Sequence, residues 1–331
     1  MNSDPPAPAR PKVWASLITR LDYLPGLLTL HHSLRRAGSA YPLVALITDT
    51  LPPAGVQALQ ARGITYHIVP RLVPSHQRDY AADPRFYDTW TKLAVFSLTR
   101  YSRVVLLDSD MLVRQNMDEL MDIPLDPPPE EQEQQAQPDL PPPATNGHTT
   151  PQRSRIFAAV PACTCNPLGK PHYPPTWTPT NCAFTAQHSS PSAAQTSAPD
   201  PGPLARLNSG LLALVPSATL YARILARMEH DDTADMIFPD QDLLAELFRG
   251  SWVPLPYVYN ALKTLRWEGV HGAIWRDEHV RNVHYIMDPK PWDEIGDKGE
   301  WTGKDVISRW WFDVHVERKA LEKTRGISDE F

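Results

Sequence analysis

The sequence predicts an α/β fold in which a mainly parallel central sheet is flanked by helices. Short apolar runs alternate with segments of helical periodicity, which is the pattern of βαβ units. The 331 residues include 42% hydrophobic residues and 10 Trp, enough for a substantial core. One apolar run ends in two acidic residues, as VVLLDSD. Ligands of open parallel sheets gather at the carboxyl ends of the strands, so these acids mark a candidate site.

Six runs are expected to form the strands of this sheet. Each run is five or six residues long, is rich in apolar residues, and lies between segments of helical or turn-rich sequence. The runs cover residues 13–18, 43–48, 64–69, 103–108, 156–160 and 211–215.

The expected helices follow from apolar periodicity and from residues that start or stop helices. Residues 90–102 are apolar most of the way round, which indicates a buried helix. Ser217 can cap a helix, and Gly250 can end the helix that contains DQDLLAELF. A last helix is expected from Asp305. Its inward positions are expected to be Val306, Trp310 and Val314.

We expect a single domain over residues 12–325, preceded by a disordered tail at 1–11. Two stretches break the α/β pattern: residues 126–155, which hold eight Pro, and residues 187–205, which are rich in Ser, Ala and Pro. Neither carries enough apolar surface to offset the entropy of ordering it. Because strand-like sequence resumes after each, both are interpreted as disordered insertions within one domain.

Composition argues against several classes of protein. A net charge of −6 provides no basic surface for nucleic acid. The N-terminus lacks the apolar segment of a secretory signal, and no apolar run approaches the roughly 18 residues of a membrane span. Three Cys and the absence of an Asn-x-Ser/Thr sequon favour the cytoplasm. The oligomeric state stays open.

The Asp-x-Asp pair is the first candidate for chemistry. Asp108 and Asp110 follow a buried run, where an unpaired carboxylate is costly. Such a pair can offer oxygens to Mg²⁺ or Mn²⁺, which in turn holds a diphosphate. Alternatively, the two acids cap a turn or pair with Arg103 and Arg114. There is no GxGxxG after a strand and no P-loop, so a nicotinamide dehydrogenase or an NTPase is not favoured.

Further polar groups occur late in the chain. Asn208 precedes a buried strand, and Asp240 and Gln241 stand at a helix start, where a plain first-turn acid is the alternative. His284 follows the strand-like NVHYI, and Lys290 comes six positions later. By itself, a histidine such as His284 is more often a structural residue than a metal ligand.

The ordered set DSDML, LNSG, PDQDLL, PYVYNAL and HYIMDPKPW resembles glycosyltransferase family 8, to which glycogenin and galactinol synthases belong. TKLAVFSLTRYSRVVLLDSD fits the same pattern, and the ending WTGKDVISRWWFDV and the CTC of VPACTC are similar to galactinol synthases. The resemblance runs from about residue 13 to about residue 315. It implies a GT-A fold, that of nucleotide-diphospho-sugar transferases, a UDP-sugar donor, and Mn²⁺ with Mg²⁺ as the alternative.

The resemblance also implies roles for individual residues. Asp108, Asp110 and His284 would hold the metal, and Lys290 would contact the diphosphate. The family retains anomeric configuration, and we favour front-face transfer, with Asp240 and Gln241 positioning the sugar, over double displacement. The acceptor would be a polyol, saccharide or glycan. The donor would be lined by Thr19, Tyr23, Lys92, Ser109, Asn208, Gly210, Asp240 and Gln241.

Two features depart from the family pattern. Ala162 stands where family members have an Asp, so the identity of the transferred sugar stays open. Cys163, Cys165 and Cys182 could bind a soft metal with His172, but their spacing does not match a zinc template, and an acceptor-side loop is the favoured interpretation.

Two other functions compete with sugar transfer. A haloacid-dehalogenase-like Mg²⁺ phosphatase also places Asp-x-Asp at a strand end. That motif usually follows an early strand and has a Thr or Val two positions on, whereas this chain has Leu112 after a middle strand. A non-catalytic sugar-nucleotide-binding protein is the second rival, because of the insertions and Ala162. None of the 11 Tyr lies in a tail suited to self-glycosylation, so a separate acceptor is expected.

Overall fold

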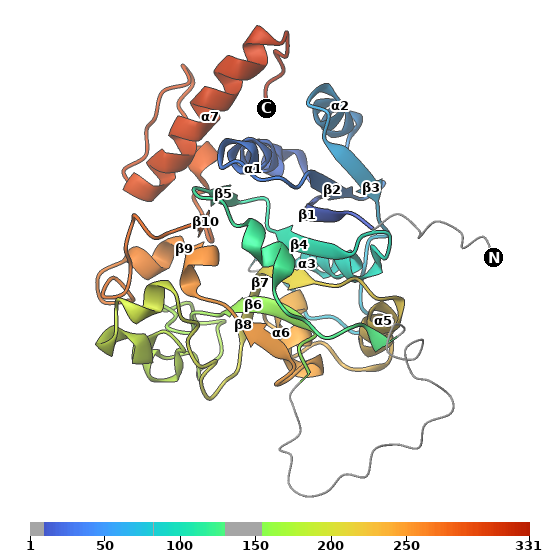
Figure 1. The fold of residues 1–331 in the computed structure, drawn as a ribbon, viewed down its shortest axis with the longest axis vertical. Helices are drawn as coiled ribbons and strands as arrows, with labels where there is room; N and C mark the ends of the chain where they lie inside the picture. The colour runs from blue at the N-terminus through green and yellow to red at the C-terminus, as the bar shows by residue number, and fades with distance from the viewer. Residues whose placement is uncertain (1–9, 82, 130–153) are drawn as a thin grey trace, which may run out of the picture.

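The computed structural model describes residues 10–81, 83–129 and 154–331. Its main sheet has seven strands in the order β3-β2-β1-β4-β7-β6-β8. β1 to β4 are parallel, and β7 runs antiparallel to both β4 and β6. The predicted mainly parallel α/β sheet is therefore confirmed (Figure 1). The strands are β1 (Lys12–Ile18), β2 (Leu43–Ile47), β3 (Thr65–Ile68), β4 (Arg103–Leu107), β6 (Phe157–Pro161), β7 (Leu207–Leu214) and β8 (Trp252–Pro254).

A second, three-stranded sheet has the order β5-β10-β9. It consists of β5 (Met111–Val113), β9 (Ala261–Leu262) and β10 (Asn282–His284). β10 pairs antiparallel with β5 and parallel with β9. Because β5 begins immediately after the Asp-x-Asp pair, this pairing brings the late part of the chain to the end of β4.

Helices cover the sheet on both sides, and the alternation of β4 shows that each side has its own core. Val105 and Leu107 belong to the core beneath α1 and α7, whereas Val104 and Leu106 belong to the core beneath α5 and α6. The α-helices are α1 (Leu24–Arg36), α2 (Pro53–Ala61), α3 (Phe86–Thr89), α5 (Ala218–His230), α6 (Pro239–Leu247) and α7 (Val306–Thr324) (Figure 1). The 3-10 helices are η1 (Leu21–Tyr23), η2 (Trp90–Ser97), η3 (Asp118–Asp122), η4 (Pro179–Asn181), η5 (Thr185–Ser189), η6 (Ala193–Gln195), η7 (Tyr257–Tyr259), η8 (Lys263–Arg266) and η9 (Pro291–Glu294).

The helix predictions have mixed outcomes. Ser217 and Asp305 cap α5 and α7 as predicted, each side chain accepting a backbone N–H. The helix expected over 90–102 is instead a 3-10 helix that ends at Ser97. The inward face expected for α7 is only partly confirmed, since Val314 is buried but Val306 is 52% exposed. Ile307, Trp311 and Phe312 are buried there instead, because the two aromatic rings pack against Trp292 and Trp301.

The two expected insertions differ in what the structure describes. Residues 187–205 have a defined path with 3-10 turns instead of the expected disorder. Gln195 in this segment is buried, donates to the Ile274 carbonyl at 2.7 Å and accepts from the Tyr257 hydroxyl at 2.8 Å. Of the stretch 126–155, residues 130–153 lie outside the described part of the chain, as does most of the N-terminal tail.

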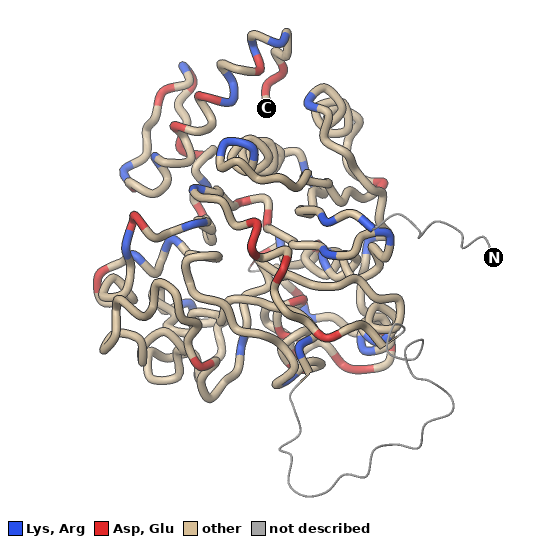
Figure 2. The backbone as a smooth tube through the Cα atoms, viewed as in Figure 1, with Lys and Arg blue, Asp and Glu red and all other residues tan. Residues whose placement is uncertain are grey.

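Basic and acidic residues are interspersed along the backbone in Figure 2. No helix within the described ranges combines the length and the apolar character that crossing a bilayer requires.

Candidate functional site

Backbone hydrogen bonds hold the Asp-x-Asp turn on two sides, one to β7 and one to the residue that follows β10. Asp108 follows the last residue of β4, and its backbone N–H donates to the Gly210 carbonyl of β7 at 2.8 Å. On the other side, the Tyr285 N–H donates to the Asp110 carbonyl at 2.9 Å. Since His284 lies opposite Met111 in the β5–β10 register, strand pairing sets the imidazole beside the two acids.

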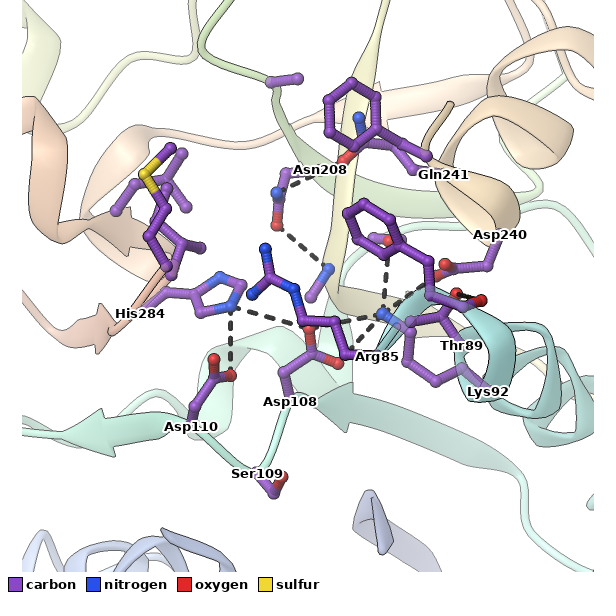
Figure 3. A pocket seen from close by; sticks show the side chains of 18 of the residues that line it. Arg85, Thr89, Lys92, Asp108, Ser109, Asp110, Asn208, Asp240, Gln241 and His284 are labelled. Carbon is purple, nitrogen blue, oxygen red and sulfur yellow. Dashed lines mark hydrogen bonds and ion pairs between the residues drawn. The ribbon is translucent and has the colours of Figure 1, made fainter. Parts of the chain in front are cut away.

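The side chains of these residues converge on one point (Figure 3). His284 Nε2 lies 3.2 Å from an Asp110 oxygen and 3.6 Å from an Asp108 oxygen. One ligand atom from each of the three residues lies within 4.8 Å of the others. Asp110 and His284 are buried, so their charges are poorly screened by water. Two carboxylates and an imidazole in this arrangement suit a divalent cation.

A chain of amides fixes the tautomer of His284. The Gly210 N–H can only donate, and it donates to Asn208 Oδ1 at 3.1 Å. Asn260 Nδ2 donates to the same oxygen at 2.7 Å, which turns Asn260 Oδ1 toward His284 Nδ1 at 2.9 Å. His284 Nδ1 therefore carries a proton, which leaves Nε2, facing the two carboxylates, as the nitrogen available to a metal. Nε2 and the carboxylate oxygens around it are donor atoms that a divalent cation can share, so the residues fit a metal.

Two buried lysines flank the acids. Lys92 of η2 places Nζ 2.9 Å from Asp240 and 3.2 Å from Asp108, as the dashed lines in Figure 3 show. Lys290 places Nζ 2.6 Å from Asp110 and donates to the Tyr285 carbonyl at 2.7 Å. Each lysine thus binds a different carboxylate of the pair.

Burial and these cations act oppositely on the two acids. Burial by itself would raise the pKa of Asp110, but Lys290 and His284 outweigh it and hold the pKa well below its usual range. Burial raises the pKa of Asp108, although Lys92 and His284 oppose the shift. Asp110 is therefore the more firmly ionised of the two and the stronger fixed anion of the site.

The structure brings the remaining predicted residues to the same cavity. Its lining includes Thr19 at the end of β1 and Tyr23 in η1, whose ring packs edge-on against Trp292 at 5.5 Å. Gln241 accepts from Asn208 Nδ2 at 3.3 Å. Lys290 reaches the site through its contact with Asp110. The other predicted lining residues are Lys92, Ser109, Asn208, Gly210, Asp240 and Gln241.

Sequence reasoning gave no site role to several groups that the structure places here. Arg85 lines the cavity and pairs with Asp83 at 2.7 Å, but its surroundings, RFYDTW, form no recognisable motif. Asn260 lies within PYVYNAL, which carried part of the resemblance, yet nothing local indicates that it binds His284. An aromatic wall completes the cavity: Phe86, Tyr173, Trp177 and Phe238, with Trp177 stacked on Phe238 at 4.4 Å.

The three cysteines do gather, but not around His172. Cys163, Cys165 and Cys182 lie together with His271. The His172 ring instead contacts Tyr173, with 5.0 Å between ring centroids. His172, the possible fourth partner named from the sequence, was therefore the wrong histidine. His271 is far along the chain, and only the fold brings it to the cysteines.

A family model described as Glycosyl transferase family 8 matches residues 16–133 and 192–296, more than half of the chain. The chain belongs to glycosyl transferase family 8. Galactinol synthase 1 from Solanum lycopersicum is 25% identical over 93% of this chain and 83% of its own length. Galactinol synthase 1 from Ajuga reptans is 27% identical over 92% of this chain and 82% of its own.

A solved structure agrees on the fold. The glycosyltransferase GlyE of Streptococcus pneumoniae TIGR4 superposes with a TM-score of 0.57 at 16% identity, covering 95% of this chain and 63% of that one. The GT-A fold expected from the resemblance is thereby confirmed. As a member of family 8, the chain is a glycosyltransferase that uses a nucleotide sugar, and the family's divalent metal finds suitable ligands in Asp108, Asp110 and His284.

Proposed function

We propose that this enzyme moves a hexosyl unit from a UDP-sugar, with retention, to a hydroxyl of a polyol, saccharide or glycan. The observation that carries the proposal is the convergence of Asp108, Asp110 and Nε2 of His284 on one point. We assign Mn²⁺ to this point, with Mg²⁺ as the alternative. The similarity to galactinol synthases makes UDP-galactose and a polyol the first donor and acceptor to test.

The residues around the metal ligands have complementary tasks in this proposal. When bound, the metal supplies positive charge for the diphosphate leaving group. Lys290, already at the edge of the carboxylate pair, adds a second cation for the same oxygens. Thr19, Tyr23 and Ser109 flank the nucleotide, and Asn208 and Gly210 line the donor while anchoring the amide chain behind His284.

Retention is best served by front-face transfer. The acceptor oxygen bonds to the anomeric carbon as the bond from that carbon to the phosphate oxygen breaks. The departing diphosphate takes the electron pair of the broken bond and the acceptor's proton. Asp240 is buried and its carboxylate lies 2.9 Å from Lys92, which favours a positioning role over that of a free nucleophile. Gln241, beside it on α6, orients the sugar together with Asn208.

The first experiment measures UDP release with Mn²⁺ from UDP-galactose, UDP-glucose, UDP-N-acetylglucosamine and UDP-xylose, with and without a polyol acceptor. Transfer from one donor is expected. Binding of UDP with Mn²⁺ but no turnover of any donor would instead support a non-catalytic protein. Phosphate release from a phosphomonoester without sugar nucleotide would support the phosphatase. Unchanged intact mass after incubation with the donor would exclude self-glycosylation.

A cytoplasmic location is also part of this proposal, supported by the cysteine content and the lack of sequons.

Asp110→Asn tests the metal assignment. The substitution keeps the shape of the side chain but removes the charge that faces His284 and Lys290, so donor turnover should be abolished while the chain still folds. Because the buried Lys290 loses its partner, the thermal unfolding midpoint should fall, and circular dichroism checks that the fold is kept. Asp313→Asn is the matched control, because Asp313 pairs with Arg309 on the surface of α7. Full activity of the Asp110 variant in saturating Mn²⁺ would refute the assignment.

A further inference from the structure

We propose that Cys163, Cys165, Cys182 and His271 form a structural zinc site, distinct from the group of Asp108, Asp110 and His284 at the sugar-transfer site. One ligand atom from each lies within 4.8 Å of the others. His271 Nε2 lies 3.2 Å from the sulfur of Cys165 and 3.2 Å from that of Cys182. All three cysteines are free thiols, so no disulfide competes for them in this structure.

The spacing matches a tetrahedral zinc ion. Zinc binds sulfur at about 2.3 Å and imidazole nitrogen at about 2.0–2.1 Å, so a tetrahedron places sulfur about 3.5 Å from nitrogen and about 3.8 Å from another sulfur. The observed contacts of 3.2 Å and the 4.8 Å limit of the cluster bracket these values. Three thiolates and one imidazole make a closed ligand set without an open position, which is typical of a structural and not a catalytic zinc.

The surroundings of His271 support a ligand role. His188 Nε2 lies 2.8 Å from His271 Nδ1, so a proton on Nδ1 can be donated to His188 while the Nε2 lone pair faces the sulfurs. A second hydrogen-bonding group of this kind behind a ligating histidine fixes its tautomer and its orientation. His271 is fully buried and the Phe184 ring packs against it with 5.5 Å between centroids, which shields the cluster from water.

Zinc at this point would join segments that are far apart in the chain. Cys163 and Cys165 follow β6, Cys182 ends η4, and His271 lies in the connection between η8 and β10. Between the second and third cysteines the chain carries Tyr173 and Trp177 of the aromatic wall. The site would therefore hold that wall beside the sugar-binding cavity, which Cys163 also lines, and none of the four zinc ligands belongs to the group of Asp108, Asp110 and His284.

Metal analysis of the full chain tests the proposal. After purification without chelators and dialysis into metal-free buffer, mass spectrometry should find one zinc ion per chain. His271→Ala should lose the zinc, whereas the matched control His172→Ala should keep it, because His172 lies outside the cluster. Zinc retained at the wild-type ratio in His271→Ala would overturn the proposed ligand set.

Two further measurements keep the proposal testable if His271→Ala does not fold. X-ray absorption of the wild-type zinc protein should show three sulfur neighbours and one nitrogen; a shell of only oxygen and nitrogen would overturn the site. Thiol titration of the denatured chain without reductant should find all three thiols, and the loss of two with no zinc present would indicate a disulfide instead. Asp110→Asn should keep its zinc, so failure of the proposed sugar transfer is distinguishable from failure of the zinc site.

Discussion

Gly210→Ala tests how narrowly His284 is positioned. Gly210 lies in β7 directly against the imidazole, and a Cβ added there would lie 2.5 Å from His284 Cε1 and 2.9 Å from its Nδ1. It would also lie 3.0 Å from Asn208 Oδ1. Gly210 also lines the donor cavity, so a control must separate an effect through the histidine from direct contact with the donor.

The magnitude follows from the overlap. To reach an ordinary contact of 3.4 Å with the new Cβ, His284 Cε1 must retreat by about 0.9 Å. Metal–ligand distances tolerate only about 0.2 Å, and a misplacement of about 1 Å can cost roughly 10²-fold in rate. We therefore expect kcat/KM to fall about 100-fold, which corresponds to about 2.7 kcal/mol. The apparent affinity for Mn²⁺ should fall by roughly 10- to 100-fold.

The assay is UDP release as a function of Mn²⁺ concentration, with the thermal unfolding midpoint as a check on the fold. His284→Ala supplies the control background. If the methyl group acts through His284, adding Gly210→Ala to His284→Ala should change the activation free energy derived from kcat/KM by less than about 0.5 kcal/mol. Wild-type rate and Mn²⁺ dependence in the single variant would refute the reasoning. A further 100-fold loss in the double variant would show that the clash acts through Asn208 or the strand instead.

Three other predictions concern the amide chain, acid stability and a buried ion pair. Asn260→Ala removes the acceptor for His284 Nδ1–H and should weaken Mn²⁺ binding about 10- to 100-fold in a Mn²⁺ titration; an unchanged titration would contradict this. Burial, together with the positive charges of Arg318 and Lys319, lowers the pKa of His315 to about 3. At pH values between about 3 and 6.5, this histidine is therefore protonated in the unfolded chain and neutral in the folded protein. Stability should therefore fall as pH drops from about 6.5 toward 3, and His315→Gln should flatten this loss in urea unfolding at pH 7 and pH 5. Arg62→Ala breaks 2.7 Å ion pairs with Glu322 and Asp329; because Glu322 keeps its pair with Arg318, the cost should be about 1–3 kcal/mol of unfolding free energy, and a cost below about 0.5 kcal/mol would contradict that.

Local sequence predicted the features that depend on near neighbours. Each predicted strand corresponds to a strand of the main sheet, since apolar runs bounded by turns are local signals. Asp108 and Asp110 were recognisable because charge directly follows a buried strand. The inward face of α7 was predicted correctly only at Val314, because apolar residues occur on more than one side of that helix and the packing of Trp311 and Phe312 decides which side is buried.

Features that depend on distant partners could not be predicted from local pattern. His284 meets Asp110 through the pairing of β10 with β5, and only the resemblance to family 8 pointed to it. Asn260 and His271 look like ordinary polar residues until the fold supplies Asn208 for one and three cysteines for the other. The composition of residues 187–205 indicated disorder, but composition does not register the buried hydrogen bonds of Gln195.

The segment between β8 and β10 contributes Asn260 to the metal-binding group around Asp108 and His271 to the cysteine cluster, and each of these residues is anchored separately. Asn260 near its start is tied to Asn208, whose oxygen is anchored by the Gly210 N–H of the central sheet. His271 further along faces the cysteines, and Tyr257, three residues before Asn260, holds the segment to Gln195. Because the amide chain behind His284 takes its orientation from the sheet, the orientation of His284 does not depend on the cysteine cluster. Metal affinity should therefore be set near Gly210, and the position of the aromatic wall near His271.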